Sequence, residues 1–228
     1  AIDGPAGAGK STVARQLAHQ LGLLYLDTGA MYRAFTWYVL SQGCDPEDEV
    51  AVADLIPKCV IKLVATQSSV GPQPPEVWVN DTLVTQAIRT AEVTAQVSTI
   101  AAQGAVRQAL VNQQMQYGLA GGVVADGRDI GTHVFPDAEL KIFLTASVNE
   151  RARRRQQDLA NQRQPVPDLT ELAKAISERD YKDSTREISP LRQADDAIEV
   201  VTDTLAVEDV LNKLLMLYEE NTVAQAES

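Results

Sequence analysis

The sequence has few cysteines, histidines and aromatic residues. Its 228 residues include two cysteines, two histidines and 5% aromatic residues. Cys44 and Cys59 stand in no CxxC pair or Cys/His cluster, so they indicate two buried or half-buried thiols, in keeping with a reducing compartment. His19 and His133 lack the spacing of metal ligands. These scarcities argue against a disulfide scaffold, a zinc site and a catalytic thiol.

Long apolar runs and an excess of positive charge are also missing. No run approaches the roughly 18 residues that a membrane helix needs, and no signal peptide is visible. The 31 acidic residues outnumber the 20 lysines and arginines, and the net charge of -11 argues against a broad nucleic-acid surface. We therefore expect a cytoplasmic protein without a membrane or nucleic-acid partner. Arginines nevertheless concentrate at 151–155, where they indicate either a solvated helix face or a small anionic ligand.

Helical and strand patterns alternate along most of the chain. Apolar spacing predicts helices over 10–21, 30–41, 90–117 with a break near Gly104, 147–163, 168–185 and 206–219. Short apolar runs predict strands over 23–26, 121–127, 140–144 and 197–201. This order is typical of an α/β fold with a mostly parallel central sheet and helices on both faces. In such folds, ligands bind beyond the carboxyl ends of the strands.

Two segments depart from this alternation. Residues 59–85 contain two short strand-like runs around the loop 67–75, which holds three prolines and one glycine. They predict an antiparallel hairpin inserted into the α/β body. The chain also opens without methionine, and Ile2 and Asp3 run directly into a glycine-rich loop. Because such a loop normally follows a full strand, we expect the N-terminal part of the first strand to be missing and the chain to be a fragment.

The glycine-rich segment at 4–11 reads GPAGAGKS and matches G-x-x-x-x-G-K-[ST] at every fixed position. Glycines let successive backbone N–H groups turn toward phosphates, and the following helix contributes its positive dipole end. Lys10 is expected to reach the β- and γ-phosphates, and the Ser11 hydroxyl is expected to ligate Mg²⁺. The motif predicts a bound nucleoside triphosphate but does not by itself specify a reaction.

Further segments, spread over most of the chain, resemble the bacterial cytidylate kinase family of P-loop nucleoside monophosphate kinases. They are DTGAMYR at 27–33, IRT at 88–90 with Val93, Ser98-x-x-Ala101 with Val106-Arg107, DGRDIGT at 126–132, and RDYKDSTR at 179–186. The hairpin is similar to the insertion that separates this family from adenylate kinases. One departure is Gly104, where many members have proline.

The resemblance implies a P-loop NTPase fold in one domain, residues 1–228. It divides the domain into a core at 1–58 and 90–228, an NMP-binding hairpin lobe at about 59–89, and a short lid at about 147–165. It also implies the activity, which is transfer of the γ-phosphoryl group of ATP to CMP, and to dCMP, with Mg²⁺. Some bacterial members are fused behind a pantoate–β-alanine ligase, and a preceding domain of that kind is compatible with the missing start.

Together with the phosphate-loop motif, the resemblance assigns roles to individual residues. The ATP-binding set is Gly4, Pro5, Ala6, Gly7, Ala8, Gly9, Lys10, Ser11 and Thr12, with Arg151, Arg154 and Arg155 from the lid. The CMP-binding set is Thr28, Arg33, Ser98, Arg107, Arg128, Asp129, Arg179, Asp183 and Arg186. The catalytic set, which spreads positive charge over the moving phosphoryl group, is Lys10, Arg33, Arg128, Arg151, Arg155 and Arg186. Asp129 and Arg107 are expected to recognise the cytosine ring.

Alternatives remain open at two levels. Arg179, Asp183 and Arg186 share one helical face, where they would also fit an ordinary ion-pair network. A different P-loop kinase, such as adenylate or shikimate kinase, is disfavoured by the segment at 126–132 and by the hairpin. A nucleotide-binding switch of the GTPase type is disfavoured because the sequence has no segment resembling N-K-x-D.

Overall fold

The structure, a computed structural model, describes residues 1–66, 71–161 and 164–226. Residues 67–70 of the predicted hairpin loop and 162–163 of the predicted lid lie outside this range. A five-stranded sheet at the centre has the order β2-β6-β1-β7-β8, and all its strand pairs are parallel. Its strands are β1 Ile2–Asp3, β2 Leu24–Asp27, β6 Val123–Gly127, β7 Ile142–Thr145 and β8 Ile198–Val201. The predicted parallel sheet is confirmed.

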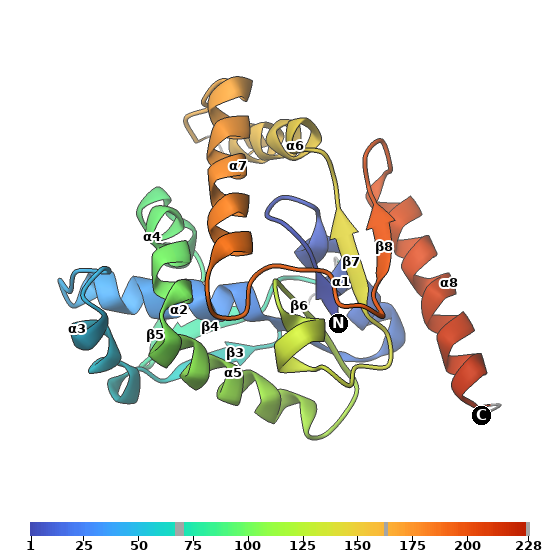
Figure 1. The fold of residues 1–228 in the computed structure, drawn as a ribbon, viewed down its shortest axis with the longest axis horizontal. Coiled ribbons are helices and arrows are strands. Elements are labelled where there is room, and N and C mark those ends of the chain that lie inside the picture. The colour runs from blue at the N-terminus through green and yellow to red at the C-terminus, as the bar shows by residue number, and fades with distance from the viewer. Residues whose placement is uncertain (67–70, 162–163, 227–228) are drawn as a thin grey trace.

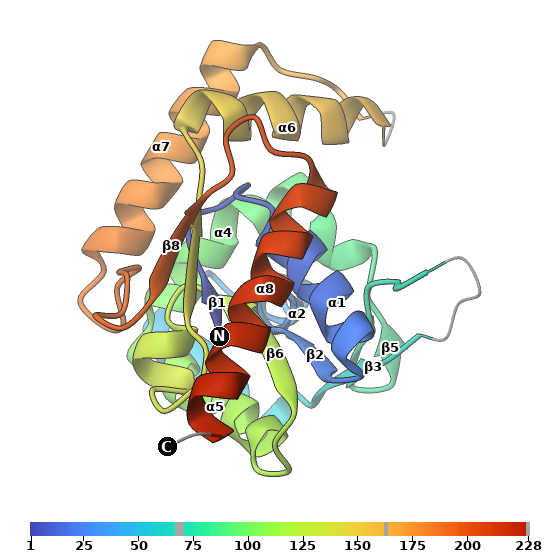
Figure 2. The ribbon, with the colours of Figure 1, turned by 90° about the vertical axis from the view of Figure 1, so that its right-hand side faces the viewer.

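Helices cover both faces of this sheet (Figure 1). The helices are α1 Lys10–Leu21, α2 Thr28–Ser41, α3 Glu49–Ala53, α4 Ala91–Ala102, α5 Gly104–Gly118, α6 Val148–Asn161, α7 Leu169–Thr185 and α8 Val207–Ala226. On one face, α1 and α8 lie side by side on apolar residues of β1, β6, β7 and β8 (Figure 2). On the other face, α2, α4 and α5 share a core with β2 and β6. The α6–α7 pair packs together above the carboxyl ends of the strands (Figure 1).

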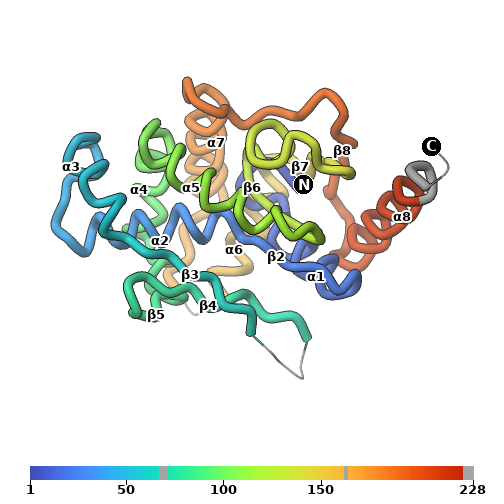
Figure 3. The backbone as a smooth tube through the Cα atoms, turned by 90° about the horizontal axis from the view of Figure 1, so that it is seen from below, coloured from blue at the N-terminus to red at the C-terminus, as the bar shows by residue number. Residues whose placement is uncertain are grey.

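The inserted segment forms a separate antiparallel sheet with strands β3 Ile61–Val64, β4 Glu76–Val79 and β5 Thr82–Leu83. The sequence predicted the first two strands and missed β5. Asn80 and Asp81, between β4 and β5, both have positive φ, as a tight two-residue hairpin turn requires. The sheet packs against α2 through Ile61, Val77 and Val79 (Figure 3).

Most predicted helix boundaries agree with the structure. The break near Gly104 is confirmed, because Gln103 has an extended backbone between α4 and α5. The helix predicted at 30–41 begins two residues earlier, at Thr28, because the Asp27 carboxylate accepts a 2.8 Å hydrogen bond from the Ala30 N–H and caps it. The last helix was predicted to end at 219 and instead runs to Ala226.

Three short helical turns were not predicted, namely η1 Ile56–Lys58, η2 Ala87–Arg89 and the π-helical turn η3 Ile130–Val134. The third is separated from β6 by Arg128 and Asp129 and carries the chain away from the carboxyl end of that strand. Within the described ranges, no helix is both long enough and apolar enough to cross a membrane.

Candidate active site

The phosphate loop, residues 4–11, leaves the carboxyl end of β1 and enters α1. Its backbone is packed so closely that a Cβ at Gly4, where φ is 145°, would lie 1.9 Å from the Leu144 carbonyl oxygen. Only glycine fits this position. Gly9 adopts a left-handed conformation, with φ 93°, directly before α1. The N-terminus of α1 therefore lies at the concave side of the loop, where backbone N–H groups can bind phosphate.

Cationic side chains hold two carbonyl groups of this loop. Lys10 Nζ donates to the Pro5 carbonyl over 2.8 Å, and Arg151 Nη1 donates to the Ala6 carbonyl over 3.0 Å. Burial, and next the positive charge of Arg128, lower the pKa of Lys10, so an anion in the loop would stabilise both cations.

A buried carboxylate stands beside the loop. Asp126, at the end of β6, accepts a 2.8 Å hydrogen bond from the Ser11 hydroxyl on Oδ2 and another of 2.8 Å from the Tyr25 hydroxyl on Oδ1. Burial, together with nearby Asp27, raises the pKa of Asp126 to about 6. Ser11 was predicted from the sequence as a Mg²⁺ ligand, whereas Asp126 was not. Hydroxyl and carboxylate oxygens are the hard donors that Mg²⁺ prefers, so these two residues fit that ion.

A second cavity, of about 70 Å³, lies between α2, α4, α7 and the segment after β6. All nine residues of the predicted CMP-binding set line it. They are Thr28, Arg33, Ser98, Arg107, Arg128, Asp129, Arg179, Asp183 and Arg186. The set includes five arginines and two aspartates, so the cavity is strongly positive in a chain whose net charge is -11. Such an excess of guanidinium groups is suited to an anionic ligand.

Asp129 forms the most deeply buried ion pair of this cavity. Its Oδ2 accepts a hydrogen bond from Arg107 Nη2, and its Oδ1 lies 3.5 Å from Arg186 Nη2. The Arg107 guanidinium carbon also lies 5.4 Å from the centre of the Tyr32 ring. Arg107 Nε and Arg186 Nη2 are buried without a hydrogen-bond partner in the described structure. These unused donors are available to a polar ligand.

Asp183 organises the other end of the cavity. Its Oδ2 accepts a 2.9 Å hydrogen bond from Arg128 Nε and lies 4.0 Å from Arg179 Nε, while Oδ1 accepts a 3.4 Å hydrogen bond from the Ser98 hydroxyl. Burial opposes ionisation of Asp183, but the Arg128 and Arg179 charges outweigh it and lower its pKa. The carboxylate is therefore charged at neutral pH and fixes two arginines that come from different elements.

Arg33 and Arg179 are two buried guanidinium groups of this cavity. Burial lowers the pKa of each to about 10, and the next largest cause is another guanidinium, Arg179 for Arg33 and Arg128 for Arg179. Arg33 Nη1 donates to the Thr94 hydroxyl at 2.9 Å. A bound phosphate would stabilise the charged form of both arginines.

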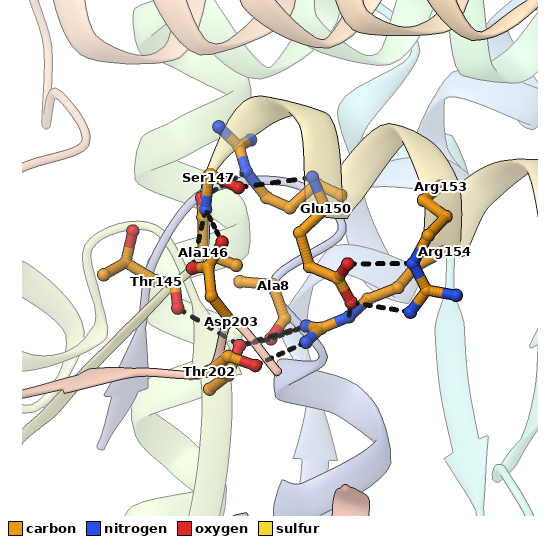
Figure 4. Close-up of polar contacts among 10 residues, drawn as sticks. Ala8, Thr145, Ala146, Ser147, Glu150, Arg153, Arg154, Thr202 and Asp203 are labelled. Atoms are coloured by element: carbon orange, nitrogen blue, oxygen red, sulfur yellow. Dashed lines mark hydrogen bonds and ion pairs between the residues drawn. The ribbon is translucent and has the colours of Figure 1, made fainter. Parts of the chain in front are cut away.

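The arginines of α6 divide into three kinds of environment. Arg154 donates to Glu150 over 2.8 Å, to the Thr202 carbonyl over 2.6 Å and to the Thr202 hydroxyl over 3.0 Å, with a longer contact of 3.4 Å to the Ala8 carbonyl. Figure 4 shows its guanidinium turned toward Thr202 and Ala8, on the phosphate-loop side. Arg153 pairs with the same Glu150, yet its side chain is 64% exposed. Of the two interpretations of the arginine cluster, the solvated helix face therefore applies to Arg153.

The other two arginines of α6, Arg151 and Arg155, differ in the number of polar contacts that they make. Arg151 is buried, because besides Ala6 it binds the Ala146 carbonyl over 2.9 Å and pairs with Asp180 over 2.6 Å. Arg155 makes no ion pair or hydrogen bond with the described residues, and its charge contributes to the lowered pKa of Arg33 and Arg179. The structure thus brings Arg151 and Arg154 to the loop backbone, whereas Arg155 makes no such contact with the described residues.

A family model described as cytidylate kinase matches residues 1–220. The chain belongs to the cytidylate kinase family. The two adjacent anion-binding features, the phosphate loop and the arginine-rich cavity, are what such a kinase needs for two phosphate-bearing substrates.

Proteins with two linked activities are among the relatives of this cytidylate kinase chain. It is 63% identical over 220 residues to a Nostoc protein named bifunctional pantoate ligase/cytidylate kinase, covering 96% of this chain and 41% of that protein. An Acaryochloris marina protein of the same name is 57% identical over 221 residues, with 96% and 42% covered. The chain spans about two fifths of the length of these curated relatives.

Several residues of this cytidylate kinase site escaped sequence reasoning. Asp126 and Asp3 end buried strands, and a carboxylate there is a signal that could have been used. Tyr25 lies one strand position before Leu26, and no local pattern marks its contact with Asp126. Thr202 follows β8, and its hydroxyl approaches the carbonyl of Ala8, which lies 194 residues earlier in the sequence. Only the folded sheet brings such pairs together.

Proposed function

We propose that this domain transfers the γ-phosphoryl group of ATP to CMP, and also to dCMP, forming ADP and the cytidine diphosphate. The observation that carries this proposal is the position of Arg128 between the two anion-binding features. Its charge lowers the pKa of Lys10 in the phosphate loop, and its guanidinium pairs with Asp183 in the second cavity. A donor phosphate and an acceptor phosphate bound on either side of Arg128 would be neighbours.

On the donor side, residues 4–12 cradle the ATP phosphates, and Lys10 leaves the Pro5 carbonyl to contact the β- and γ-phosphates. Ser11 and Asp126 hold Mg²⁺, which supplies charge neutralisation at the β- and γ-phosphate oxygens when it is bound. Arg151 and Arg155 extend the positive surface from α6. Support comes from the glycine conformations of the loop at Gly4 and Gly9 and from the oxygen pair of Ser11 and Asp126.

On the acceptor side, Arg33, Arg128 and Arg186 bind the CMP phosphate. An oxygen of that phosphate forms a bond to the γ-phosphorus as the bond from the γ-phosphorus to the β-phosphate oxygen breaks. The attacking oxygen is already anionic at neutral pH, so no protein group need remove a proton. Positioning in line and stabilisation of the spreading charge then supply the catalysis.

The nucleoside is held by the rest of the cavity. Arg179 and Asp183 bind the ribose, with Thr28 and Ser98 as nearby hydroxyl groups. Asp129 and Arg107 recognise cytosine, since a carboxylate accepts from its N4 amine and a guanidinium donates to its N3 or O2. Support comes from the buried, charged Asp129–Arg107 pair and the unused donor atoms beside it.

Two segments outside the cavity are proposed to close over the bound nucleotides. The hairpin lobe at about 59–89 and the lid at about 147–165 close over the nucleotides and exclude water, which suppresses ATP hydrolysis. The native polypeptide carries a pantoate ligase domain, as the names of its relatives suggest. The enzyme acts in the cytoplasm, where its nucleotide substrates are found, in pyrimidine nucleotide metabolism.

A coupled assay of ADP formation with CMP, dCMP, UMP, AMP and GMP as acceptors tests this function. We expect CMP and dCMP to stimulate ADP formation strongly and AMP or GMP to do so weakly. Stimulation by AMP alone would identify an adenylate kinase instead. Slow turnover that no acceptor increases would identify a nucleotide-dependent switch.

A further inference from the structure

The Asp3 side chain joins the strand before the phosphate loop to the segment after β6. Its Oδ1 accepts a 2.8 Å hydrogen bond from the Ile130 N–H, and its Oδ2 accepts one of 2.7 Å from the Gly131 N–H. The carboxylate is buried, and it makes no other hydrogen bond with the residues that the structure describes. Two short hydrogen bonds to consecutive N–H groups fix the position of that backbone.

The segment held in this way begins with two residues that line the CMP cavity. Arg128 and Asp129 directly precede Ile130, and Gly127 is the register partner of Asp3 across β1 and β6. The Asp129 carbonyl accepts from the N–H groups of the π-helical turn η3, at 2.9 Å from His133 and 3.2 Å from Val134. Strand pairing therefore fixes the backbone before Asp129, and Asp3 fixes it after.

The contact is closely packed. A Cβ placed on Gly131 would lie 3.1 Å from Lys141 Cδ and 3.4 Å from Asp3 Oδ2. Close-packed surroundings of this kind transmit a small displacement instead of absorbing it. A shift of η3 would consequently move the Asp129 carboxylate relative to Arg107 and Arg186.

We propose that Asp3 is a positioning residue for acceptor selection, acting through the Ile130 and Gly131 N–H groups on Asp129. The role rests on the proposed function of Asp129 as a contact of cytosine. It differs from a role in ATP binding, since the Asp3 carboxylate is directed at η3 and forms no hydrogen bond to residues 4–11 in the described structure.

The substitution Asp3→Asn tests this proposal in the full chain. An amide oxygen still accepts from one N–H, whereas the amide NH₂ meets the second N–H as donor against donor. We expect kcat/KM for CMP to fall about 10-fold or more, and the CMP to UMP ratio of kcat/KM to fall with it. The KM for ATP should change less than about 2-fold. A loss shared equally by CMP and UMP, or an unchanged ratio, would overturn the proposal.

Two controls separate positioning from general destabilisation. Val210→Ala creates a cavity in the α1–α8 core, on the other side of the sheet, and should lower the melting temperature without changing the CMP to UMP ratio. If it changes the ratio as much as Asp3→Asn does, the ratio reports stability and the proposal fails. Should Asp3→Asn not fold, Asp3→Glu keeps the charge but displaces the carboxylate from the two N–H groups and should lower the ratio, and an unchanged ratio there would overturn the proposal.

A double-mutant cycle with Asp129→Ala, which removes the side-chain acceptor altogether, identifies the route of the effect. If Asp3 acts through the Asp129 side chain, the double variant has the same CMP to UMP ratio as Asp129→Ala alone. Additive losses would show that Asp3 acts elsewhere. The proposed function fails separately, since in that case the wild-type protein would not phosphorylate CMP.

Discussion

The Ser11 hydroxyl donates a 2.8 Å hydrogen bond to the Asp126 carboxylate, and so joins the first turn of α1 to the end of β6. Both side chains place an oxygen atom that could coordinate a metal ion beside the phosphate loop. The Tyr25 hydroxyl occupies the other carboxylate oxygen at 2.8 Å. Asp126 is thus oriented by two hydrogen bonds before any nucleotide arrives, an arrangement that favours a preformed ion site.

Asp126→Asn should abolish most of the gain in ATP affinity that Mg²⁺ provides. The amide keeps the shape of the side chain but loses the charge that attracts the ion. Calorimetric titration of ATP with and without Mg²⁺ measures this gain directly. Tyr25→Phe is the matched control, because it removes a hydrogen bond to Asp126 without removing an oxygen ligand. It should keep most of the gain, and an equal loss in both variants would contradict the ligand role of Asp126.

The same carboxylate predicts a pH dependence of stability in the nucleotide-free, Mg²⁺-free protein. Burial raises the pKa of Asp126 from its ordinary value of 3.8 to about 6, so the folded state binds its proton more tightly than the unfolded state does. The contribution of Asp126 to stability is present below pH 4 and is lost as the pH rises through 6. As the pH rises from 4 to 7, the free energy of unfolding of the wild type should fall by up to about 3 kcal/mol relative to that of Asp126→Asn. Urea unfolding of both proteins over this pH range measures the difference. A difference that does not change with pH would refute the prediction.

The parts of the site that the sequence predicted are those with local signals. The phosphate loop carries its own motif, and all nine expected CMP contacts line one cavity, although their roles stay predictions. Ser98 and Arg107 were unremarkable helix residues without the family resemblance. The break at Gln103 was expected from Gly104, but the angle at which it sets the second of these helices does not follow from sequence spacing.

Long-range contacts were beyond prediction for a physical reason. The lid arginines were expected to face the ATP phosphates, yet Arg151 and Arg154 bind carbonyl groups that are 145 and 146 residues distant in sequence. The N–H groups of a guanidinium can donate to a carbonyl oxygen, a carboxylate or a phosphate, since all three are hydrogen-bond acceptors. Which partner is within reach depends on the packing of α6 over the loop, and residue identity alone does not determine that.

Arg153 and Arg154 form a natural pair for testing the lid. They are adjacent on α6 and share Glu150, but only Arg154 reaches Thr202 and approaches the phosphate loop (Figure 4). Arg154→Gln should raise the KM for ATP by about 10-fold with little change for CMP, whereas Arg153→Gln should leave both unchanged because exposed ion pairs contribute little. Steady-state kinetics with each substrate varied checks both. Equal effects of the two substitutions would contradict a specific role for Arg154.

Lys10→Met should abolish phosphoryl transfer while leaving the protein folded. The aliphatic chain of methionine fills the same buried space, and the lost charge is one that we assign to the transition state. We expect kcat to fall at least about 100-fold with a melting temperature close to that of the wild type. Circular dichroism of the variant, measured alongside the assay, ensures that a loss of activity is not a loss of fold. Near-normal turnover in the folded variant would remove Lys10 from the mechanism.

We expect the choice between cytosine and uracil to depend on the buried Asp129 carboxylate. Cytosine presents an N4 amine donor beside the N3 and O2 acceptors, whereas uracil presents an O4 acceptor and an N3–H donor. Asp129 can accept from the cytosine amine, and Arg107 can donate to its N3 or O2. Against uracil, the carboxylate would face a carbonyl oxygen in a site where both charged side chains are almost completely buried, at 6% and 3% side-chain exposure.

Mispaired polar groups in such a site cost about 1–3 kcal/mol, so we expect the wild type to prefer CMP to UMP by about 10-fold or more. Asp129→Asn should narrow this preference mainly by losing CMP activity. Its amide oxygen can still accept from N4, but Arg107 and Arg186 lose the negative charge that holds them together. Asp183→Asn, at the ribose end of the cavity, is the matched control and should weaken both nucleotides without changing their ratio. The measurement is kcat/KM for CMP and UMP in all three proteins. Equal use of both bases by the wild type would refute the base-recognition role of Asp129, while the phosphate loop and its chemistry would be unaffected.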